Sequence, residues 1–390
     1  LRRAIGKRHH IVFGRRGSGK SSLLRKAGTD LTIDRRPIAY VDLEAFKGHS
    51  YPDVLLSVLI ATFQEFQKWI NTAAIHPATK KSFWKQLFGS APTCAAYNKK
   101  NCIQLSEKLD KQIKELQQQL HASDAAEIQK KTENKYSTEQ SAEVGGGLSS
   151  PIAAVKSEIK ISDIDQQVEN IQEVFKRSKV DFLHRHILDY QQMFREMADI
   201  SNGDSYLFLD DLYHIRRHDQ PHVVDYFHRI AKGQNLWLKI GTIRHRTSWY
   251  VHGDPPTGVK LGDDADDIDL DLTLEKYDLA KEFLRKILIN FAKETNLLPL
   301  NKFLTDGAID RLVLASGGVA RDFLSVFRRS IDVARQRRKG RWGSSVGAED
   351  VNVAAGEHDT SKREEFKKDT SDEDHDLDKE FQGIRNFCLE

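Results

Sequence analysis

Short apolar runs and amphipathic patterns alternate in the first 80 residues. Residues 10–13 and 38–45 are largely apolar and predict two buried strands. Between residues 51 and 72, apolar side chains recur three or four positions apart, which predicts a helix that buries one face. Strands that alternate with helices are typical of a parallel sheet covered by helices. The pattern therefore predicts an α/β fold.

The alternation resumes after residue 180. Apolar residues at helical spacing from 183 to 197 predict a helix, and the runs at 205–211 and 236–240 predict two more buried strands. Further helical patterns follow at about 275–293, 303–315 and 319–338. These last helices predict an all-helical second domain.

Residues 81–180 interrupt the alternation with a polar stretch rich in Gln, Lys, Glu and Ser. Apolar residues over 105–120 predict a helix of about two heptads, too short to establish a coiled coil alone. Residues 131–163 have the composition of a flexible linker, and apolar residues over 164–175 restart a helix. The stretch is either a helical hairpin that binds a partner protein or a second copy, or an unstructured insertion without function.

The changes in pattern predict the domain boundaries. We expect a core made of residues 1–80 and 181–272, the insertion 81–180, a helical lid domain 273–342 and a polar tail 343–390. The tail ends with apolar residues at helical spacing, so it is expected to start a further domain. Since only ten residues precede the first core strand and the chain begins with Leu1, we expect it to be part of a longer protein.

The composition excludes several classes of protein. Hydrophobic residues make up 39% of the chain, enough for a sizeable globular core. No apolar run approaches the ~18–20 residues that cross a bilayer, and no signal peptide opens the chain, so we expect a cytoplasmic protein without membrane contact. Three scattered cysteines are too few for a disulfide framework or a zinc site: Cys94, Cys102 and Cys388. Four histidines have helical metal-ligand spacing, but without cysteines they are better explained as core or surface residues: His214, His218, His222 and His228.

The charge is unevenly distributed, although the formal net charge is only +3. Basic residues gather in the first 26 positions and again at 335–341, while acidic runs lie at 263–271 and 372–378. Such runs are compatible with an ordinary solvated surface. The basic clusters also allow contact with duplex DNA.

A phosphate-binding motif follows the first predicted strand. Residues 14–21 read Gly-Arg-Arg-Gly-Ser-Gly-Lys-Ser, the Walker A pattern, and an apolar helix start comes next. Glycines let backbone N–H groups converge on phosphate oxygens, and the helix N-terminus attracts anions. We expect Lys20 to reach the β- and γ-phosphates of ATP and Ser21 to ligate Mg²⁺. The expected nucleotide-binding residues of this segment are Gly14, Arg15, Arg16, Gly17, Ser18, Gly19, Lys20, Ser21 and Ser22.

The predicted strand 205–211 ends in two carboxylates, the Walker B pattern. A rigid strand can hold Asp210 beside the phosphate loop, where it would bind Mg²⁺, usually through water. Asp211 is then expected to orient or deprotonate the attacking water. A Glu is commoner at this position, so the shorter Asp211 side chain would have to reach farther.

Polar residues also end the strand at 236–240. Thr242 and Arg244 are candidates to face the γ-phosphate and respond to its loss. Arg246 is a candidate arginine finger that acts on a neighbouring copy. The alternative is that these residues simply end the strand and contact solvent or acidic side chains.

A Gly-Gly turn at 317–318 leads into the last predicted helix. Arg321 lies in the first turn of that helix, where the helix dipole disfavours a cation. This position suggests that Arg321 has an anionic partner such as bound nucleotide.

Taken in this order, the Walker A loop, the Walker B strand, the polar strand end and the Gly-Gly-x-x-Arg turn resemble the AAA+ ATPase superfamily. The likeness is greatest to its origin-recognition and Cdc-type initiator branch, and it covers about 1–80 and 180–338. The resemblance implies that Thr242 or Arg244 is sensor 1 and that Arg321 is sensor 2. The Asp-Asp ending departs from the Asp-Glu of most AAA+ proteins, and the Gly-Thr-Ile-Arg segment at 241–244 is similar to STAND signalling ATPases. Both features favour a slow, switch-like ATPase.

The resemblance and the motifs predict a P-loop ATPase core with a mainly parallel sheet, a helical insertion and an all-helical lid. We expect a slow hydrolase that uses ATP and Mg²⁺ as a conformational switch on DNA or on a DNA-bound complex. The alternative is a STAND-type signalling ATPase that forms oligomers on ATP binding, as in prokaryotic defence.

Overall fold

The computed structural model describes residues 1–75, 97–143, 174–296, 299–337, 345–370 and 375–389. Contacts divide the chain into two units, each described by itself below. The core unit comprises Leu1–Phe13 and Lys20–Asp269. The helical unit comprises Gly14–Gly19 and Leu270–Glu390. No helix among the described residues is both long enough and apolar enough to cross a membrane.

The core unit is built on a five-stranded sheet in which all pairs are parallel. Its strands are β1 (His9–Phe13), β2 (Ile38–Asp42), β3 (Ser205–Asp210), β4 (Leu236–Thr242) and β7 (Ala265–Asp269). They lie in the order β2-β3-β4-β1-β7, so β4 separates the strand before the Walker A motif from the strand that ends in Asp210. The predicted α/β fold with a parallel sheet is confirmed.

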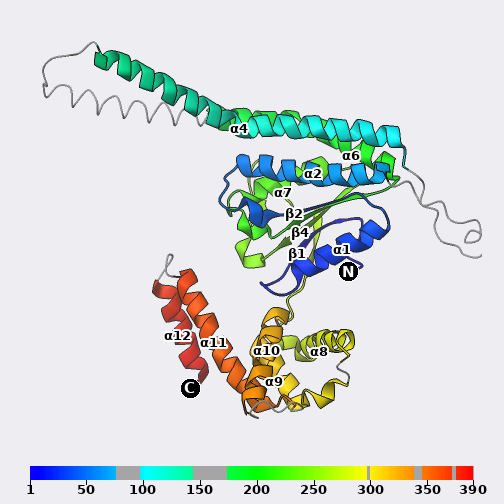
Figure 1. Cartoon of the computed structure of the whole chain (residues 1–390), viewed down its shortest axis with the longest axis vertical. Helices are drawn as coiled ribbons and strands as arrows, with labels where there is room; N and C mark the ends of the chain where they lie inside the picture. The colour runs from blue at the N-terminus through cyan, green and yellow to red at the C-terminus, as the bar shows by residue number, and fades with distance from the viewer. Residues whose placement is uncertain (76–96, 144–173, 297–298, 338–344, 371–374, 390) are drawn as a thin grey trace, which may run out of the picture. The chain divides into compact units, whose positions relative to one another are not determined.

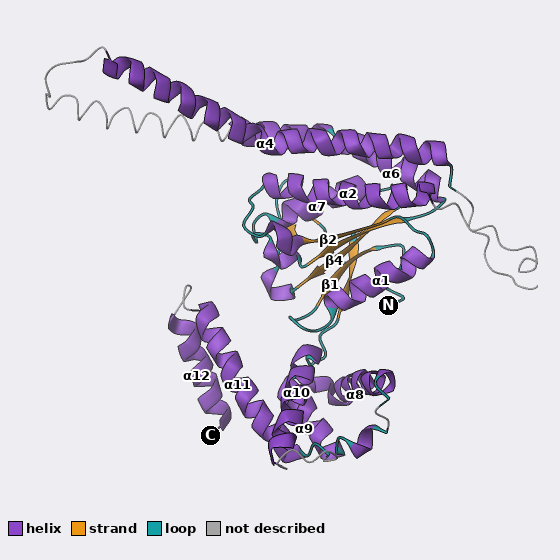
Figure 2. Cartoon of the chain, viewed as in Figure 1, coloured by secondary structure: helices purple, strands orange, loops and turns teal. Residues whose placement is uncertain are grey.

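Helices cover both faces of this sheet, as Figures 1 and 2 show. The helices of the core unit are α1 (Lys20–Ile33), α2 (Asp53–Ile75), α4 (Lys99–Glu143), α6 (Ile187–Ser201) and α7 (Gln220–Ala231), of which α4 packs on α2 and α6. Because side chains alternate along a strand, Leu207 and Leu209 join the core under α2, α6 and α7. Phe208 and Asp210 lie on the opposite face, where α1 packs.

Short elements complete the core unit. The 3-10 turns are η1 (Leu43–Phe46), η2 (Leu212–His214) and η3 (Arg244–Arg246), and the small antiparallel hairpin is β5 (Tyr250–Val251) with β6 (Thr257–Gly258). The Asp225 carboxylate on α7 accepts a hydrogen bond from the Gly258 backbone, which ties this hairpin to the covering layer. The first two turns follow β2 and β3, and the third follows β4, so all three lie at the carboxyl edge of the sheet.

The first part of the predicted insertion packs into the core. Helix α4 is 45 residues long, not the two heptads predicted, and it includes residues 131–143, which the composition had indicated as linker. Its apolar stripe is buried against α2: Cys102, Leu105, Leu109, Ile113 and Leu116. Residues 174–185 are helical as well. The predictions for residues 81–96 and 144–173, Cys94 among them, lie outside the described residues.

The acidic run at 263–271 contains an edge strand that the apolar pattern did not predict. Strand β7 pairs with β1 from His9–Ala265 to Phe13–Asp269. Ala265 and Ile268 are buried, whereas Asp267 and Asp269 are exposed. An edge strand needs partners on one side only, so a charged sequence can form it through backbone hydrogen bonds.

The helical unit has its own apolar core. Its elements are η4 (Leu274–Lys276), α8 (Tyr277–Glu294), η5 (Leu300–Lys302), α9 (Asp306–Ser316), α10 (Ala320–Arg337), α11 (Ala348–Thr370) and α12 (His375–Leu389). The Thr305 hydroxyl accepts a hydrogen bond from the Ala308 backbone and caps α9. Gly317, in the left-handed conformation, ends the same helix. The all-helical character predicted for 273–342 is present in its described residues. The predicted polar tail starts with α11, which packs on α9 and α10 and adds Val351 and Ala354 to the core of this unit.

Candidate functional site

The carboxyl edge of the core sheet collects most of the residues that the sequence singled out. Strand β3 ends at Asp210 and β4 ends at Thr242. Helix α1 starts at Lys20, directly after the glycine-rich loop. The carboxyl edge of an open parallel sheet is where α/β proteins bind ligands.

Lys20 is buried, with only 5% of its surface exposed. Its ammonium lies over the ring of Tyr213, 5.9 Å from the centroid. A lysine is rarely buried unless it is paired. Lys20 also acts electrostatically on Asp211, whose pKa it lowers against other, larger effects. The motif lysine and the second Walker B carboxylate therefore influence each other inside the core unit.

Asp210 is held on both of its oxygens. Its Oδ2 accepts a hydrogen bond from the Tyr40 hydroxyl, and its Oδ1 accepts one from the Asp211 backbone N–H at 3.0 Å. A Cβ on Gly241 would lie 2.5 Å from Oδ1, so only glycine leaves room for the carboxylate. The side chain is 2% exposed. Asp210 is thus a buried carboxylate in one fixed orientation.

Asp211 has a left-handed backbone, with φ 58° and ψ 46°, which is rare for a residue other than glycine. This conformation turns the chain sharply at the end of β3. Burial and the neighbouring Asp210 raise the pKa of Asp211 above its usual value. Unusual backbone and a raised carboxyl pKa often accompany functional sites.

Thr242 is completely buried at the end of β4. Its hydroxyl is hydrogen-bonded to the hydroxyl of Thr247, which also donates to the backbone oxygen of Ile243 at 2.8 Å. These bonds fold the turn after β4 back onto the strand. Thr247 was not predicted, and no local pattern marks it.

The two arginines after β4 differ in their surroundings. Arg244 forms ion pairs with Asp267 at 3.0 Å and Asp269 at 3.6 Å, and its guanidinium lies over the ring of Phe13. It is therefore engaged with the edge strand β7. Arg246 is exposed, and its backbone oxygen accepts a hydrogen bond from Gln220 at 3.4 Å.

In the helical unit, the loop Gly14–Gly19 is held by the segment after β7 and by the Gly-Gly turn. The Asp271 carboxylate accepts from the Arg15 backbone N–H at 2.7 Å. The Arg15 guanidinium donates to the backbone oxygens of Leu272 and Gly317. The loop is therefore anchored at two places: at Asp271 and Leu272, which follow β7, and at Gly317, which precedes α10.

Gly17 and Arg321 touch within the same unit. The Arg321 backbone N–H donates to the Gly17 oxygen at 3.3 Å. A Cβ on Gly17, where φ is +90°, would lie 2.6 Å from the Cβ of Arg321. The Arg321 side chain itself is exposed. Beside them, the hydroxyl of Ser18 is buried and has no hydrogen-bond partner, an arrangement that is costly unless a ligand completes it.

Two histidines of the histidine-rich stretch, His222 and His228, make packing contacts with other rings. His222 stacks on Tyr51, and His228 lies against His9 in the core. Within the described residues, no group of three His, Cys, Asp or Glu side chains is placed to hold a metal ion.

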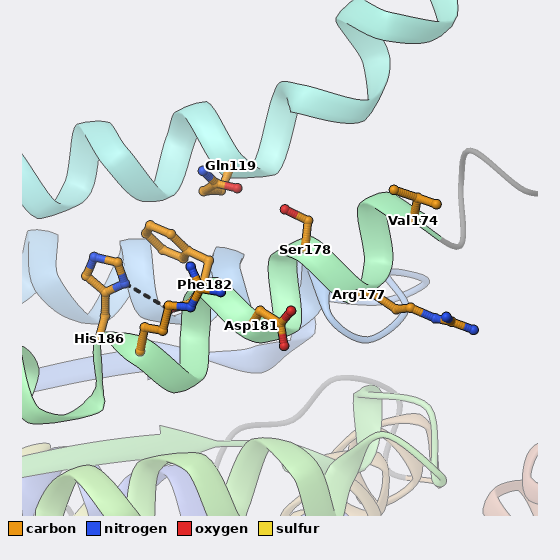
Figure 3. A pocket seen from close by; sticks show the side chains of 8 residues that line it. Gln119, Val174, Arg177, Ser178, Asp181, Phe182 and His186 are labelled. Atoms are coloured by element: carbon orange, nitrogen blue, oxygen red, sulfur yellow. Dashed lines mark hydrogen bonds between the residues drawn. The ribbon is translucent and has the colours of Figure 1, made fainter.

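A separate hollow of about 480 Å³ lies between α4 and the helical residues 174–185. Figure 3 shows Gln119 on one side, with Ser178 and Phe182 facing it from the other. Arg177 and Arg185 add positive charge to its wall. None of the predicted nucleotide residues lines it, so it is unrelated to the carboxyl edge of the sheet.

Comparison with known proteins adds no relative: no family model and no curated sequence matches the chain. The site therefore has to be argued from its own residues. Sequence reasoning missed Tyr40, Gly241 as a packing requirement, Thr247 and Asp271. Gly241 stood in the segment 241–244, Asp271 in the acidic run 263–271 and Tyr40 in a predicted strand, but no sequence pattern assigned any of them a role at the site.

Proposed function

We propose that the chain is an ATP-binding P-loop ATPase that hydrolyses slowly and works as a conformational switch. The observation that carries the proposal is that Lys20 of the Walker A sequence is buried at the start of α1 in the core unit, which also holds the buried, oriented Asp210. A glycine-rich surface loop that binds no ligand does not predict a buried lysine and a buried carboxylate in the same unit. The orphaned Ser18 hydroxyl supports a ligand at the loop.

The donor groups fit Mg²⁺, which prefers oxygen ligands. Under the proposal, Asp210 and the Ser21 hydroxyl would hold the ion, which would neutralise charge on the phosphate groups. Lys20 would bind phosphate oxygens directly, and the backbone amides of Gly17 and Gly19 would donate to them. Gly19 has a φ of +98° and carries no Cβ, so its backbone N–H can approach a phosphate oxygen closely.

Asp211 would orient the water that attacks the terminal phosphate. Its raised pKa favours proton acceptance, whereas its short side chain and constrained backbone limit its reach. Slow turnover is the expected consequence. Arg321, whose backbone N–H donates to Gly17, would contact phosphate groups held by the loop of the same unit.

Binding of a fluorescent ATP analogue to wild type and to Lys20→Ala tests the proposal. Loss of the lysine charge should weaken binding about 10- to 100-fold, as expected for charge-assisted hydrogen bonds. Lys26→Ala is the matched control, because Lys26 is an exposed lysine of the same helix that pairs with Asp30. If wild type binds no nucleotide, or if both variants bind like wild type, the proposal fails.

Duplex DNA is a second candidate ligand, favoured by two basic turns at the carboxyl edge. The buried Gln220 side chain donates to the backbone oxygens of Ile215 and Arg246 and accepts from Ser248. It thereby joins the turn that carries Arg216 and Arg217 to the turn that carries Arg246. In the described structure none of these three exposed arginines forms an ion pair.

Fluorescence anisotropy with a random-sequence duplex tests this candidate. Affinity should fall about tenfold or more between ~50 and ~200 mM salt, and Arg216→Ala/Arg217→Ala should weaken it. Arg229→Ala, an exposed arginine elsewhere on the core unit, is the control. No binding at low salt excludes DNA, and ATP-dependent oligomers that Lys20→Ala abolishes would favour the signalling alternative.

A further inference from the structure

The strand β2 contributes a side chain to the carboxyl edge that neither Walker motif contains. Tyr40 lies two residues before the end of β2 and opposite Phe208 of β3. The two rings stack with centroids 6.2 Å apart on the face of the sheet that α1 covers. From there the Tyr40 hydroxyl reaches Asp210 and donates to its Oδ2.

This hydrogen bond completes the restraint on Asp210. One oxygen is fixed by the Asp211 backbone, and the space beside it exists only because residue 241 is glycine. The other oxygen has the Tyr40 hydroxyl. Removal of that hydroxyl would free the carboxylate to rotate about its last torsion, which is intrinsically soft.

The Tyr40 hydroxyl acts as a hydrogen-bond donor to Asp210. The guanidinium of Arg25, on the first turns of α1, lies over the tyrosine ring at 5.0 Å from its centroid. A tyrosine phenol has its proton at neutral pH, so the hydroxyl can donate. An ionised Asp210 can only accept, and a protonated Tyr40 can always donate to it.

We propose that Tyr40 is a positioning residue that orients Asp210 for Mg²⁺ before the ion arrives. Groups that hydrogen-bond to a metal-binding carboxylate fix its direction, and their loss typically lowers metal affinity about 10- to 100-fold. The inference rests on the proposed function, since it assumes that Asp210 holds the metal. It assigns the role to the hydroxyl and not to the ring.

The test is a Mg²⁺ titration of Tyr40→Phe at saturating ADP, read as the concentration that gives half of the nucleotide-dependent rise in melting temperature. We expect this midpoint to increase about tenfold. The affinity for nucleotide in EDTA should stay within about twofold of wild type, because phosphate binding by the loop does not involve Tyr40. If the role of Tyr40 were merely structural, the variant would bind both Mg²⁺ and nucleotide more weakly.

Two control variants isolate the hydroxyl. Tyr206→Phe removes a tyrosine hydroxyl from the adjacent strand, where it donates to the Ile5 backbone oxygen, and should leave the midpoint unchanged. Arg25→Met removes the cation over the ring but keeps the hydroxyl, and should change the midpoint about twofold at most. In an Asp210→Ala background, Tyr40→Phe should have no further effect, because both act on the same ligand.

The outcomes separate the two proposals. If wild type does not bind nucleotide, the proposed function fails. If Asp210→Ala raises the Mg²⁺ midpoint but Tyr40→Phe does not, the role of Tyr40 is refuted and the proposed function stands. An equal effect of Tyr40→Phe with and without Asp210 would also refute it, because the hydroxyl would then act elsewhere.

Discussion

The two units hold their predicted nucleotide residues by different means. In the core unit, Asp210 is buried and both of its oxygens accept hydrogen bonds from named groups. In the helical unit, the loop 14–19 is held mainly through backbone groups, and the Arg321 side chain is exposed. A buried, fully bonded carboxylate has one orientation, whereas an exposed arginine samples many rotamers. The core unit is preorganised, and the helical unit is adaptable.

The largest expected effect is that of Asp211→Ala on hydrolysis. If the core unit carries the chemistry, the rate of ATP hydrolysis should fall about 100-fold or more, the usual contribution of a general base. Nucleotide affinity should change little. Phosphate release measured under saturating ATP checks this, with the exposed Asp199→Ala on α6 as control. Equal rates for the two variants would remove Asp211 from the mechanism.

Acid should weaken the core unit. Burial lowers the pKa of both His9 and His10 to about 4, with smaller contributions from His228 and Lys239 for His9 and from Lys239 for His10. Between pH 6.5 and 4 these two histidines therefore bind protons in the unfolded chain but not in the folded chain. Stability should fall across this window, by at most about 3 kcal/mol for each histidine.

Thermal melts of wild type at pH 7 and pH 4.5 measure this loss. His9→Gln should show a smaller difference between the two conditions, whereas the exposed His245→Gln should behave like wild type. An unchanged difference in His9→Gln would show that other groups account for the acid sensitivity.

Gly241→Ala should disturb the preorganised carboxylate directly. The added methyl would lie 2.5 Å from Asp210 Oδ1 and 2.8 Å from Leu24, so about 1–3 kcal/mol of stability should be lost. Gly28→Ala is the matched control, because its Cβ would make only an ordinary contact with Phe208 at 3.9 Å. Denaturant unfolding compares them, and Gly28→Ala should be neutral or stabilising.

A smaller effect is expected in the loop of the helical unit. Gly17 and Gly19 both have positive φ, but only a Cβ on Gly17 would meet Arg321. Gly17→Ala should therefore speed hydrogen exchange at the start of α10, where the Arg321 amide bonds to Gly17, several-fold more than Gly19→Ala. Equal exchange in both variants would mean that the Gly17–Arg321 contact contributes nothing.

The sequence predicted those parts of the site that follow from local rules. Apolar strands that end in polar residues placed Asp210 and Thr242 at strand ends, and the Walker A pattern placed Lys20 at the start of a helix. Tyr40 could not be found in this way, because it meets Asp210 through the pairing of strands 170 positions apart. Strand order is set by packing of the whole sheet, which no local window contains.

Two of the elements that the sequence analysis missed have different physical explanations. The far part of α4, including 131–143, lacks an apolar stripe but is rich in Gln, Lys, Glu and Ala, whose helix propensity outweighed the missing periodicity. Strand β7 has the sequence of an acidic run, because only Ala265 and Ile268 in it are buried. Propensity would have corrected the first prediction, and nothing local would have corrected the second.

The acidity of β7 has a consequence for association. As the last strand of the sheet, it presents backbone groups to which another chain could add. Three of its five residues are aspartates, and two of them share Arg244 while the third pairs with Arg8. An incoming strand would have to break these ion pairs and bury the carboxylates. The same charges that made β7 hard to predict from the sequence therefore protect it from edge-to-edge aggregation.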